Sequence, residues 1–214
     1  MDPYFAMDGV SNSTLSYIKN YFTPNLFQMD KDIRDKAYAF GTLIDALITE
    51  PEKVNHFNRT VGRLDFNKQE FETALRMKDA CLSDPFCAEI LPLCEFQRVS
   101  VVEQFAIDHD GIEFSLKAKC KWDIFVEGFD LSGDIKSTSA TTQQEFENAV
   151  NFFDYDRQRA WYMDLEHRSN DILIGISKVN YKVFKVPVKK GSNLYNSGRA
   201  KYQELAFKYW YLYS

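Results

Sequence analysis

The sequence of 214 residues has no long apolar run, and it carries little cysteine or histidine. No stretch approaches the roughly eighteen consecutive apolar residues that a membrane-spanning helix needs. The opening segment, MDPYFAMDGVSNS, has neither the basic nor the apolar region of a signal peptide. We therefore expect no membrane partner and a cytoplasmic location.

The few cysteines do not form a recognisable pattern. Cys81, Cys87, Cys94 and Cys120 match neither a C-x-x-C pair nor a zinc-binding spacing. Thiols without such a pattern in a chain of this composition are usually buried and unreactive. We expect free thiols in the core.

An overall positive charge is also missing, since the net charge is −5 at pH 7. The charge is unevenly divided: residues 171–214 carry +6, so the preceding residues carry −11. Affinity for phosphate depends on local positive charge rather than on the total. This division agrees with an acidic metal site beside a basic surface, and a solvated surface is the alternative.

The length and the apolar content of 45% fit one domain with a substantial core. We divide residues 1–214 into a helical part (1–96), a sheet with its following helices (97–188) and a last helix (189–214). Spacings of three and four predict helices, and a period of two predicts strands. The expected helices cover 11–22, 30–49, 68–81, 84–91, 141–153, 155–165 and residues after 193. The period changes to two from Gln97, and the expected strands include 100–107, 112–121, 171–177 and 181–188. Asp110-Gly111 is the expected turn between the first two of these strands.

This order predicts an α/β fold, with a central mixed sheet flanked by helices. In the helix over 30–49 the expected buried stripe includes Ile33, Ala37 and Phe40. Residues 54–65 show no clear period, and we expect them to be irregular.

The stretch Cys120–Thr138 contains two aspartates in a setting of β-branched and aromatic residues. Asp123 is followed eleven positions later by Asp134-Ile135-Lys136, and both aspartates are expected at strand ends. Mg²⁺ prefers oxygen ligands, which Asp123, Asp134 and the Ile135 carbonyl supply. Alternation places Lys136 on the face of Asp134, where its ammonium orients water or stabilises phosphate charge, and turns the Ile135 side chain toward the core. A surface turn with a salt bridge is the alternative reading.

Alternation along the strand over 112–121 places three lysines on the face of Asp123. They are Lys117, Lys119 and Lys121. Such a row predicts contact with a DNA backbone. A strand edge protected by lysines explains it equally well.

Gln158 and Tyr162 stand four positions apart, so they share one face of the helix over 155–165. Alone they are ordinary residues of an amphipathic helix. With Asp123 and the triplet from Asp134 to Lys136 they give the order D…D-x-K…Q-x-x-x-Y. This order resembles the PD-(D/E)XK nuclease superfamily, in particular RecE-type phage exonucleases and RecB-like nuclease domains.

Two further segments carry the same resemblance. Residues 10–19 are similar to the family's I-S-x-S-x-L opening, and residues 40–51 to its F-G-T-x-x-H-x-L-x-x-E-P helix. The resemblance therefore covers most of the chain. Asp45 stands where that helix usually carries a histidine near the metal, and Trp122 replaces the family's proline.

The resemblance implies a restriction-endonuclease-like core that uses Mg²⁺, with Mn²⁺ as a substitute. It implies Asp123, Asp134 and Ile135 as metal ligands, with Glu103 and Asp45 as additions. Lys136 would assist the water, while Gln158 and Tyr162 would position the DNA strand or the lysine.

The activity that the resemblance implies is metal-dependent exonuclease cleavage of linear duplex DNA in phage or mobile-element recombination. It also implies a homo-oligomer and a single-strand annealing protein as partner. A structure-specific or restriction-type endonuclease is the nearest alternative. A nuclease-like module that binds DNA or a partner without cutting is a third reading, which Asp45 keeps open.

Overall fold

The structure is a computed structural model that describes residues 3–24 and 30–213. Within these ranges no helix is both long enough and apolar enough to cross a bilayer. The helices are α1 (Asn12–Phe22), α2 (Lys31–Thr49), α3 (Lys68–Ser83), α4 (Pro85–Ile90), α5 (Gln143–Phe152), α6 (Tyr155–Leu165) and α7 (Asn193–Tyr213). The strands are β1 (Val54–Asn55), β2 (Thr60–Val61), β3 (Leu64–Asp65), β4 (Glu95–His109), β5 (Ile112–Val126), β6 (Leu131–Thr138), β7 (Asn170–Ser177) and β8 (Val183–Lys189).

Five strands form the central sheet in the order β4-β5-β6-β7-β8. Neighbours run antiparallel except β6 and β7, which are parallel because the helices α5 and α6 connect them. The predicted mixed sheet flanked by helices is confirmed. β8 lies at an edge, where Pro187 is tolerated because an edge strand leaves backbone groups unpaired.

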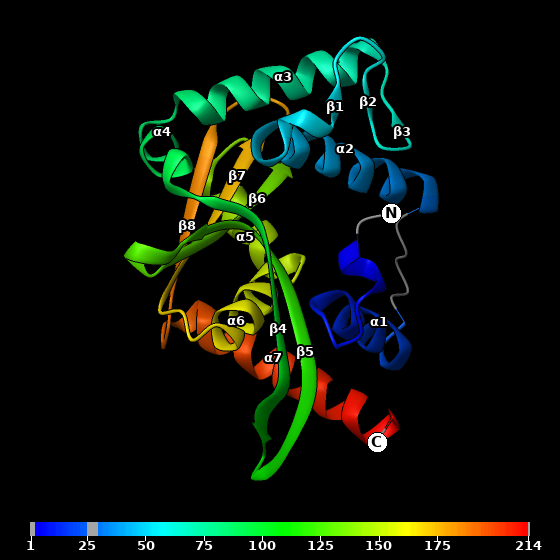
Figure 1. The fold of residues 1–214 in the computed structure, drawn as a ribbon, viewed down its shortest axis with the longest axis vertical. Helices are drawn as coiled ribbons and strands as arrows, with labels where there is room; N and C mark the ends of the chain where they lie inside the picture. The colour runs from blue at the N-terminus through cyan, green and yellow to red at the C-terminus, as the bar shows by residue number, and fades with distance from the viewer. Residues whose placement is uncertain (1–2, 25–29, 214) are drawn as a thin grey trace.

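Helices cover both faces of the sheet, and each face has its own hydrophobic cluster. One cluster joins the sheet to α1, α5, α6 and α7, and the other joins it to α2, α3 and α4. Figure 1 shows α2 and α3 at one end of the molecule and α1, α6 and α7 toward the other. Three of the four expected free thiols are buried, while Cys94 is partly exposed.

Several local features of the structure follow directly from the residue types present. Ser11 caps α1 and exchanges hydrogen bonds with Thr14, which satisfies amide groups that the first turn leaves free. Asp110 and Gly111 both have positive φ values, of 52° and 81°, as a two-residue hairpin turn requires. The turn joins β4 and β5 into a long ribbon that extends past α7 (Figure 1).

Two expectations about the amino-terminal part are wrong. In α2 the residues Ile33 and Ala37 are exposed, because only the second half of the helix packs on the sheet. Residues 54–65, expected to be irregular, form the small antiparallel sheet β1-β2-β3. Its strands have two residues each, too few for a period of two to be visible in the sequence.

Candidate functional site

The site lies at a fork in the central sheet. Strands β5 and β6 pair only from Ile124 to Val126, opposite Gly133 to Leu131. Asp123 is the next residue of β5 before the paired part, and Asp134 is the next residue of β6 after it. The two aspartates therefore face each other where pairing stops, and the expectation that they lie at strand ends is wrong.

The side chain of Asp123 replaces the missing strand partner. Its Oδ2 accepts a hydrogen bond of 2.9 Å from the backbone amide of Ile135, a group that β5 would have satisfied in a continuous ladder. The Ile135 side chain is buried on the other face, among the residues that pack under α2, as expected.

Arg168 holds the closed end of the fork. Its Nη2 donates to the carbonyl oxygens of Val126 at 2.7 Å and Leu131 at 3.0 Å, the last residue of β5 and the first of β6. The guanidinium also lies 4.4 Å from the ring centre of Phe125. These contacts fix the spacing of the two strands next to the aspartates.

Asp134 is buried and faces two cations. Its Oδ2 forms an ion pair with the ammonium of Lys136, which confirms that both side chains share a face. Its Oδ1 accepts from Nη1 of Arg159 at 3.3 Å. The carboxylate is therefore held from two directions by positive charge.

Arg159 of α6 is fully buried and forms a bidentate pair with Asp171 of β7. Nε donates to Oδ1 and Nη2 to Oδ2, both at 2.7 Å. The guanidinium carbon lies 4.7 Å from the ring centre of Tyr162 and 5.2 Å from that of Trp122, a cation–π arrangement. Sequence analysis missed this pair. The available signal was a single acid at the start of the otherwise apolar strand over 171–177.

A second polar cluster lies on the α2 side of the fork. The Nε2 of Gln97 donates to both carboxylate oxygens of Asp45, at 3.0 Å each, and to Oγ1 of Thr49 at 2.9 Å. Gln97 has φ of 56°, and the neighbouring pairs of the β4–β5 ladder place it opposite Asp123. Sequence analysis did not predict Gln97.

The electrostatics join these two clusters into one site. Burial raises the pKa of Asp123 well above its usual value, and the charges of Asp45 and Asp134 raise it further. Burial also raises the pKa of Asp45, with Asp134 adding to the effect. Burial alone would lower the pKa of Lys136, but Asp134 and Asp123 raise it above the usual value. Lys136 is therefore a stable cation.

The site carries excess negative charge. Four carboxylates (Asp45, Asp123, Asp134 and Asp171) interact with two cations, Lys136 and Arg159, which leaves two negative charges when all are ionised. Among the described residues, no three His, Cys, Asp or Glu side chains converge as a complete metal cage.

Mg²⁺ does not need such a cage, because it is commonly held by one or two carboxylates while keeping several waters. The buried Oδ2 of Asp134 has no hydrogen-bond partner of good geometry. Asp123, Asp134 and the Ile135 carbonyl offer hard oxygen donors, and the surplus charge matches that of one divalent ion. The residues fit such an ion.

Gln158 and Tyr162 lie differently from the expected position beside the lysine. Tyr162 is buried against Trp122, with ring centres 5.2 Å apart, and Gln158 lies one turn before it on α6. The residues of α6 that approach Asp134 and Lys136 are instead Arg159 and Tyr155. The ammonium of Lys136 lies 5.2 Å from the ring centre of Tyr155.

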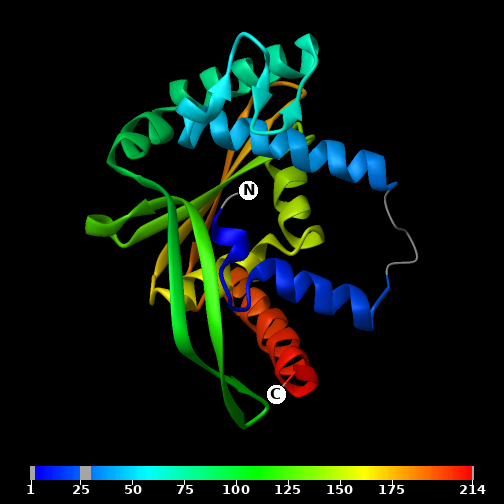
Figure 2. The ribbon, with the colours of Figure 1, turned by 45° about the vertical axis from the view of Figure 1, so that its right-hand side comes forward.

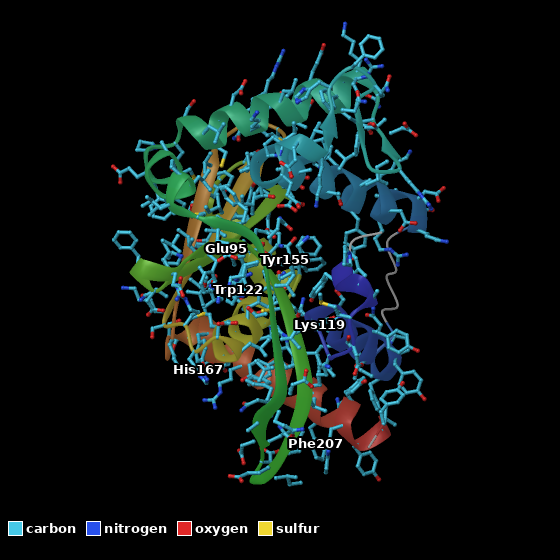
Figure 3. The ribbon with its side chains drawn as sticks, viewed as in Figure 1. Glu95, Lys119, Trp122, Tyr155, His167 and Phe207 are labelled. Atoms are coloured by element: carbon cyan, nitrogen blue, oxygen red, sulfur yellow. The ribbon has the colours of Figure 1, made fainter. Side chains whose placement is uncertain are left out.

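The expectations about the lysine row and Glu103 need correction. Lys119 is buried, and its ammonium donates to the carbonyl oxygens of Tyr4 and Met7, because the amino-terminal segment covers this face of β5 (Figure 3). Glu103 pairs with Lys117 at 3.0 Å. Arg98 of β4 pairs with Trp122, the neighbour of Asp123, and so marks the position of the fork. Glu103 is five residues further along β4, which places it roughly 17 Å from the fork.

Lys117 and Lys121 are both partly exposed, and the ammonium of Lys117 is paired with Glu103. A continuous row of three free lysines is therefore not present.

The basic residues of the carboxyl-terminal part are also largely paired. Five of the eight form ion pairs with acids: Lys185, Lys190, Arg199, Lys201 and Lys208. The predicted basic surface is thus mostly neutralised within the fold.

Two cavities among the described residues lie away from the fork. One of about 200 Å³ lies between α1 and α7, beside Lys19, Arg157 and Lys201. Another of about 320 Å³ lies between α4 and the end of α2, beside Ile48 and Cys87. Neither is lined by Asp123, Asp134 or Lys136.

No protein-family model matches the sequence. No curated protein matches it either. Solved structures do align over most of the chain. A phage-related exonuclease from Haemophilus somnus 129PT is 12% identical, with a TM-score of 0.44, and the alignment covers 94% of this chain and 82% of that one. An alkaline exonuclease from Laribacter hongkongensis is 16% identical, with a TM-score of 0.39, over 99% of this chain and 96% of that one. At these low values, the function has to be inferred from the chain's own residues.

Proposed function

We propose that this chain is a metal-dependent DNA exonuclease that hydrolyses phosphodiester bonds from the ends of linear duplex DNA. The observation that carries the proposal is the meeting of Asp123, Asp134 and Lys136 at the fork between β5 and β6. Two carboxylates and a lysine in this order are the motif that resembles the PD-(D/E)XK nucleases.

Asp123, Asp134 and the Ile135 carbonyl would hold Mg²⁺, or Mn²⁺ in its place, with Asp45 close enough to add charge. When bound, the ion would activate a water and neutralise negative charge on the phosphate. Arg159 orients Asp134, because the guanidinium donates a hydrogen bond to its Oδ1.

Lys136 acts as a cation in this proposal. Because its pKa is raised, the ammonium stays protonated and cannot accept a proton from the water. It would hold the attacking water or a phosphate oxygen by electrostatic attraction.

The test compares linear duplex DNA with a covalently closed circle of the same sequence, in Mg²⁺ and in EDTA. We expect mononucleotides to be released from the linear substrate in Mg²⁺, but not from the linear substrate in EDTA or from the closed circle. Lys136→Met should lower this rate on the order of 10²-fold, since a preorganised charge is removed. Lys182→Met, at an exposed position, is the matched control. Metal-dependent cleavage of the closed circle would instead identify an endonuclease.

A second candidate function is a nuclease-like module that binds DNA or a protein without cutting. It is favoured by the contacts of Asp134, whose two oxygens are already opposed by Lys136 and Arg159. Binding of DNA with no cleavage in Mg²⁺ or Mn²⁺ would support this candidate over the first.

The role in phage or mobile-element recombination, a single-strand annealing partner and a homo-oligomer are supported by the sequence resemblance alone. Sedimentation velocity of the purified chain tests the oligomer directly. Co-purification with an annealing protein encoded nearby tests the partner.

A further inference from the structure

Three aromatic side chains follow one another from Lys136 to the surface. The ammonium of Lys136 lies over the ring of Tyr155 at 5.2 Å. Tyr155 stacks on Phe153, with ring centres 5.6 Å apart and an interplanar angle of 26°. Phe153 contacts Phe152 edge to face at 4.9 Å. We call Phe152, Phe153 and Tyr155 the aromatic strip.

The outer part of the strip is exposed to solvent. Phe153 is 50% exposed and Phe152 is 78% exposed. Both lie where α5 turns into α6, and Figure 2 shows this turn on the side of the molecule where α1 and the first half of α2 project. Tyr38 of α2 is 69% exposed and lies close enough to Tyr155 to affect its pKa.

Exposed aromatic rings in such a row have a specific use beside a phosphate-binding site. Every nucleobase has a flat face, and stacking of bases on aromatic side chains is a sequence-independent way to bind single-stranded nucleic acid. A base pair inside a duplex offers no free face, because both its faces are already stacked. The rings are therefore suited to unpaired bases.

We propose that the aromatic strip stacks with unpaired nucleobases next to the phosphate held at Lys136, so that the substrate reaches the site as a single strand. This inference rests on the proposed function and narrows its substrate. The ends of a linear duplex would have to fray before cleavage, which agrees with an enzyme that acts from ends.

Continuity with the fork favours a nucleic-acid strand over a protein partner. The strip begins at Tyr155, whose ring is in contact with the ammonium of Lys136. A strand whose phosphate lies at Lys136 therefore has its neighbouring bases within reach of Tyr155 and Phe153. A protein partner would not require the aromatic strip to begin beside Lys136, whereas a nucleic-acid strand would.

The test measures binding without metal, so that it does not depend on cleavage. One oligonucleotide carries normal bases, and a second of the same length carries abasic sites that keep the phosphates. We expect the wild-type chain to bind the normal strand on the order of tenfold more tightly than the abasic strand. Phe152→Ala and Phe153→Leu should each remove most of this difference, while leaving affinity for the abasic strand unchanged.

Phe57→Ala is the matched control, because Phe57 is 91% exposed and lies in the turn between β1 and β2. It should bind both strands like the wild type. Because Phe152 is so exposed, Phe152→Ala should keep the wild-type thermal unfolding midpoint, which separates lost stacking from lost folding.

Three outcomes would overturn the inference. The wild type could bind both strands equally, the strip variants could weaken both strands equally, or Phe152→Ala could convert an oligomer to a monomer in sedimentation. The last result would assign the strip to an interface between copies. If the chain binds the normal strand more tightly than the abasic strand but never cleaves DNA, the stacking inference stands and only the nuclease activity is rejected.

Discussion

The two aspartates at the fork have opposite surroundings. Asp134 is held by Lys136 and Arg159, so each of its oxygens faces a cation. Asp123 accepts one backbone hydrogen bond, and burial and the charges of Asp45 and Asp134 raise its pKa, while Lys136 offsets this rise only in part. One carboxylate is compensated by two cations, and the other is compensated only in part.

This difference shows where a divalent ion would have its effect. An added cation would relieve less repulsion at Asp134, because Lys136 and Arg159 already face its two oxygens. The Asp123 and Asp45 side carries repulsion that an added cation would remove. We therefore infer that Asp134 sets the geometry of the site, while Asp123 and Asp45 provide most of its attraction for the ion.

The largest effect is expected from Asp134→Ala. The change removes the carboxylate that Lys136 and Arg159 both contact, so Mg²⁺-dependent cleavage of linear DNA should fall on the order of 10³-fold. Initial rates measure the loss, and circular dichroism checks that the fold persists. Asp108→Ala, an exposed acid on β4, is the control. A wild-type rate for Asp134→Ala would remove Asp134 from the mechanism.

The buried pair behind Asp134 should dominate stability. Arg159→Met leaves Asp171 as a buried charge without its partner, so the free energy of unfolding should fall by about 3–5 kcal/mol. The double change Arg159→Met with Asp171→Leu removes both charges and should recover most of that loss. Urea denaturation measures both. A double variant no more stable than the single one would contradict this account of the pair.

The raised pKa of Asp123 should make the stability of the metal-free protein depend on pH. The pKa of Asp123 is raised in the folded state, so its contribution to stability is complete below about pH 4 and is lost as the pH rises through the raised value. The thermal unfolding midpoint in EDTA should fall over that range, and less steeply in Asp123→Asn. Mn²⁺ should reverse the fall at neutral pH. Identical profiles for the variant and the wild type would mean that Asp123 does not titrate in this way.

The smallest effect is expected from Gln97→Ala. The amide of Gln97 holds both oxygens of Asp45, and loss of a group that orients a metal-proximal carboxylate commonly weakens affinity about tenfold. Calorimetric titration with Mn²⁺ measures the change. Gln104→Ala on the same strand should have no effect, since Gln104 is exposed, lies seven residues along β4 from Gln97 and accepts a hydrogen bond from the Ser115 hydroxyl. Equal affinities for both variants would show that the hold of Gln97 on Asp45 does not contribute to ion binding.

The sequence predicted those parts of the site that depend on local pattern. Lys136 was placed beside Asp134 because side chains two apart share a face of a strand. The packing of Ile135 followed from the same rule. The fold class followed from the change of period near residue 97, and the turn at Asp110 and Gly111 from its two residue types.

Contacts between distant segments were not predictable in this way. Strand alternation predicted an exposed Lys119. Val10 instead pairs with β5 at Ala118, so the amino-terminal segment covers the Lys119 side chain. Arg159 and Asp171 meet only because α6 packs on β7, twelve residues along the chain. Nothing in the local pattern of either residue indicates the other.

Arg168 donates hydrogen bonds to Val126 and Leu131, the residues on either side of the bend at 127–130. These bonds set the distance between β5 and β6 next to the two aspartates. Lengthening it within the exposed bend leaves the strand ends where they are. A single extra residue between Leu131 and Asp134 would turn the aspartate and the lysine to the opposite side of the sheet, since the period of a strand is two. We therefore expect an insertion in the bend to preserve the site, and an insertion between Leu131 and Asp134 to destroy it.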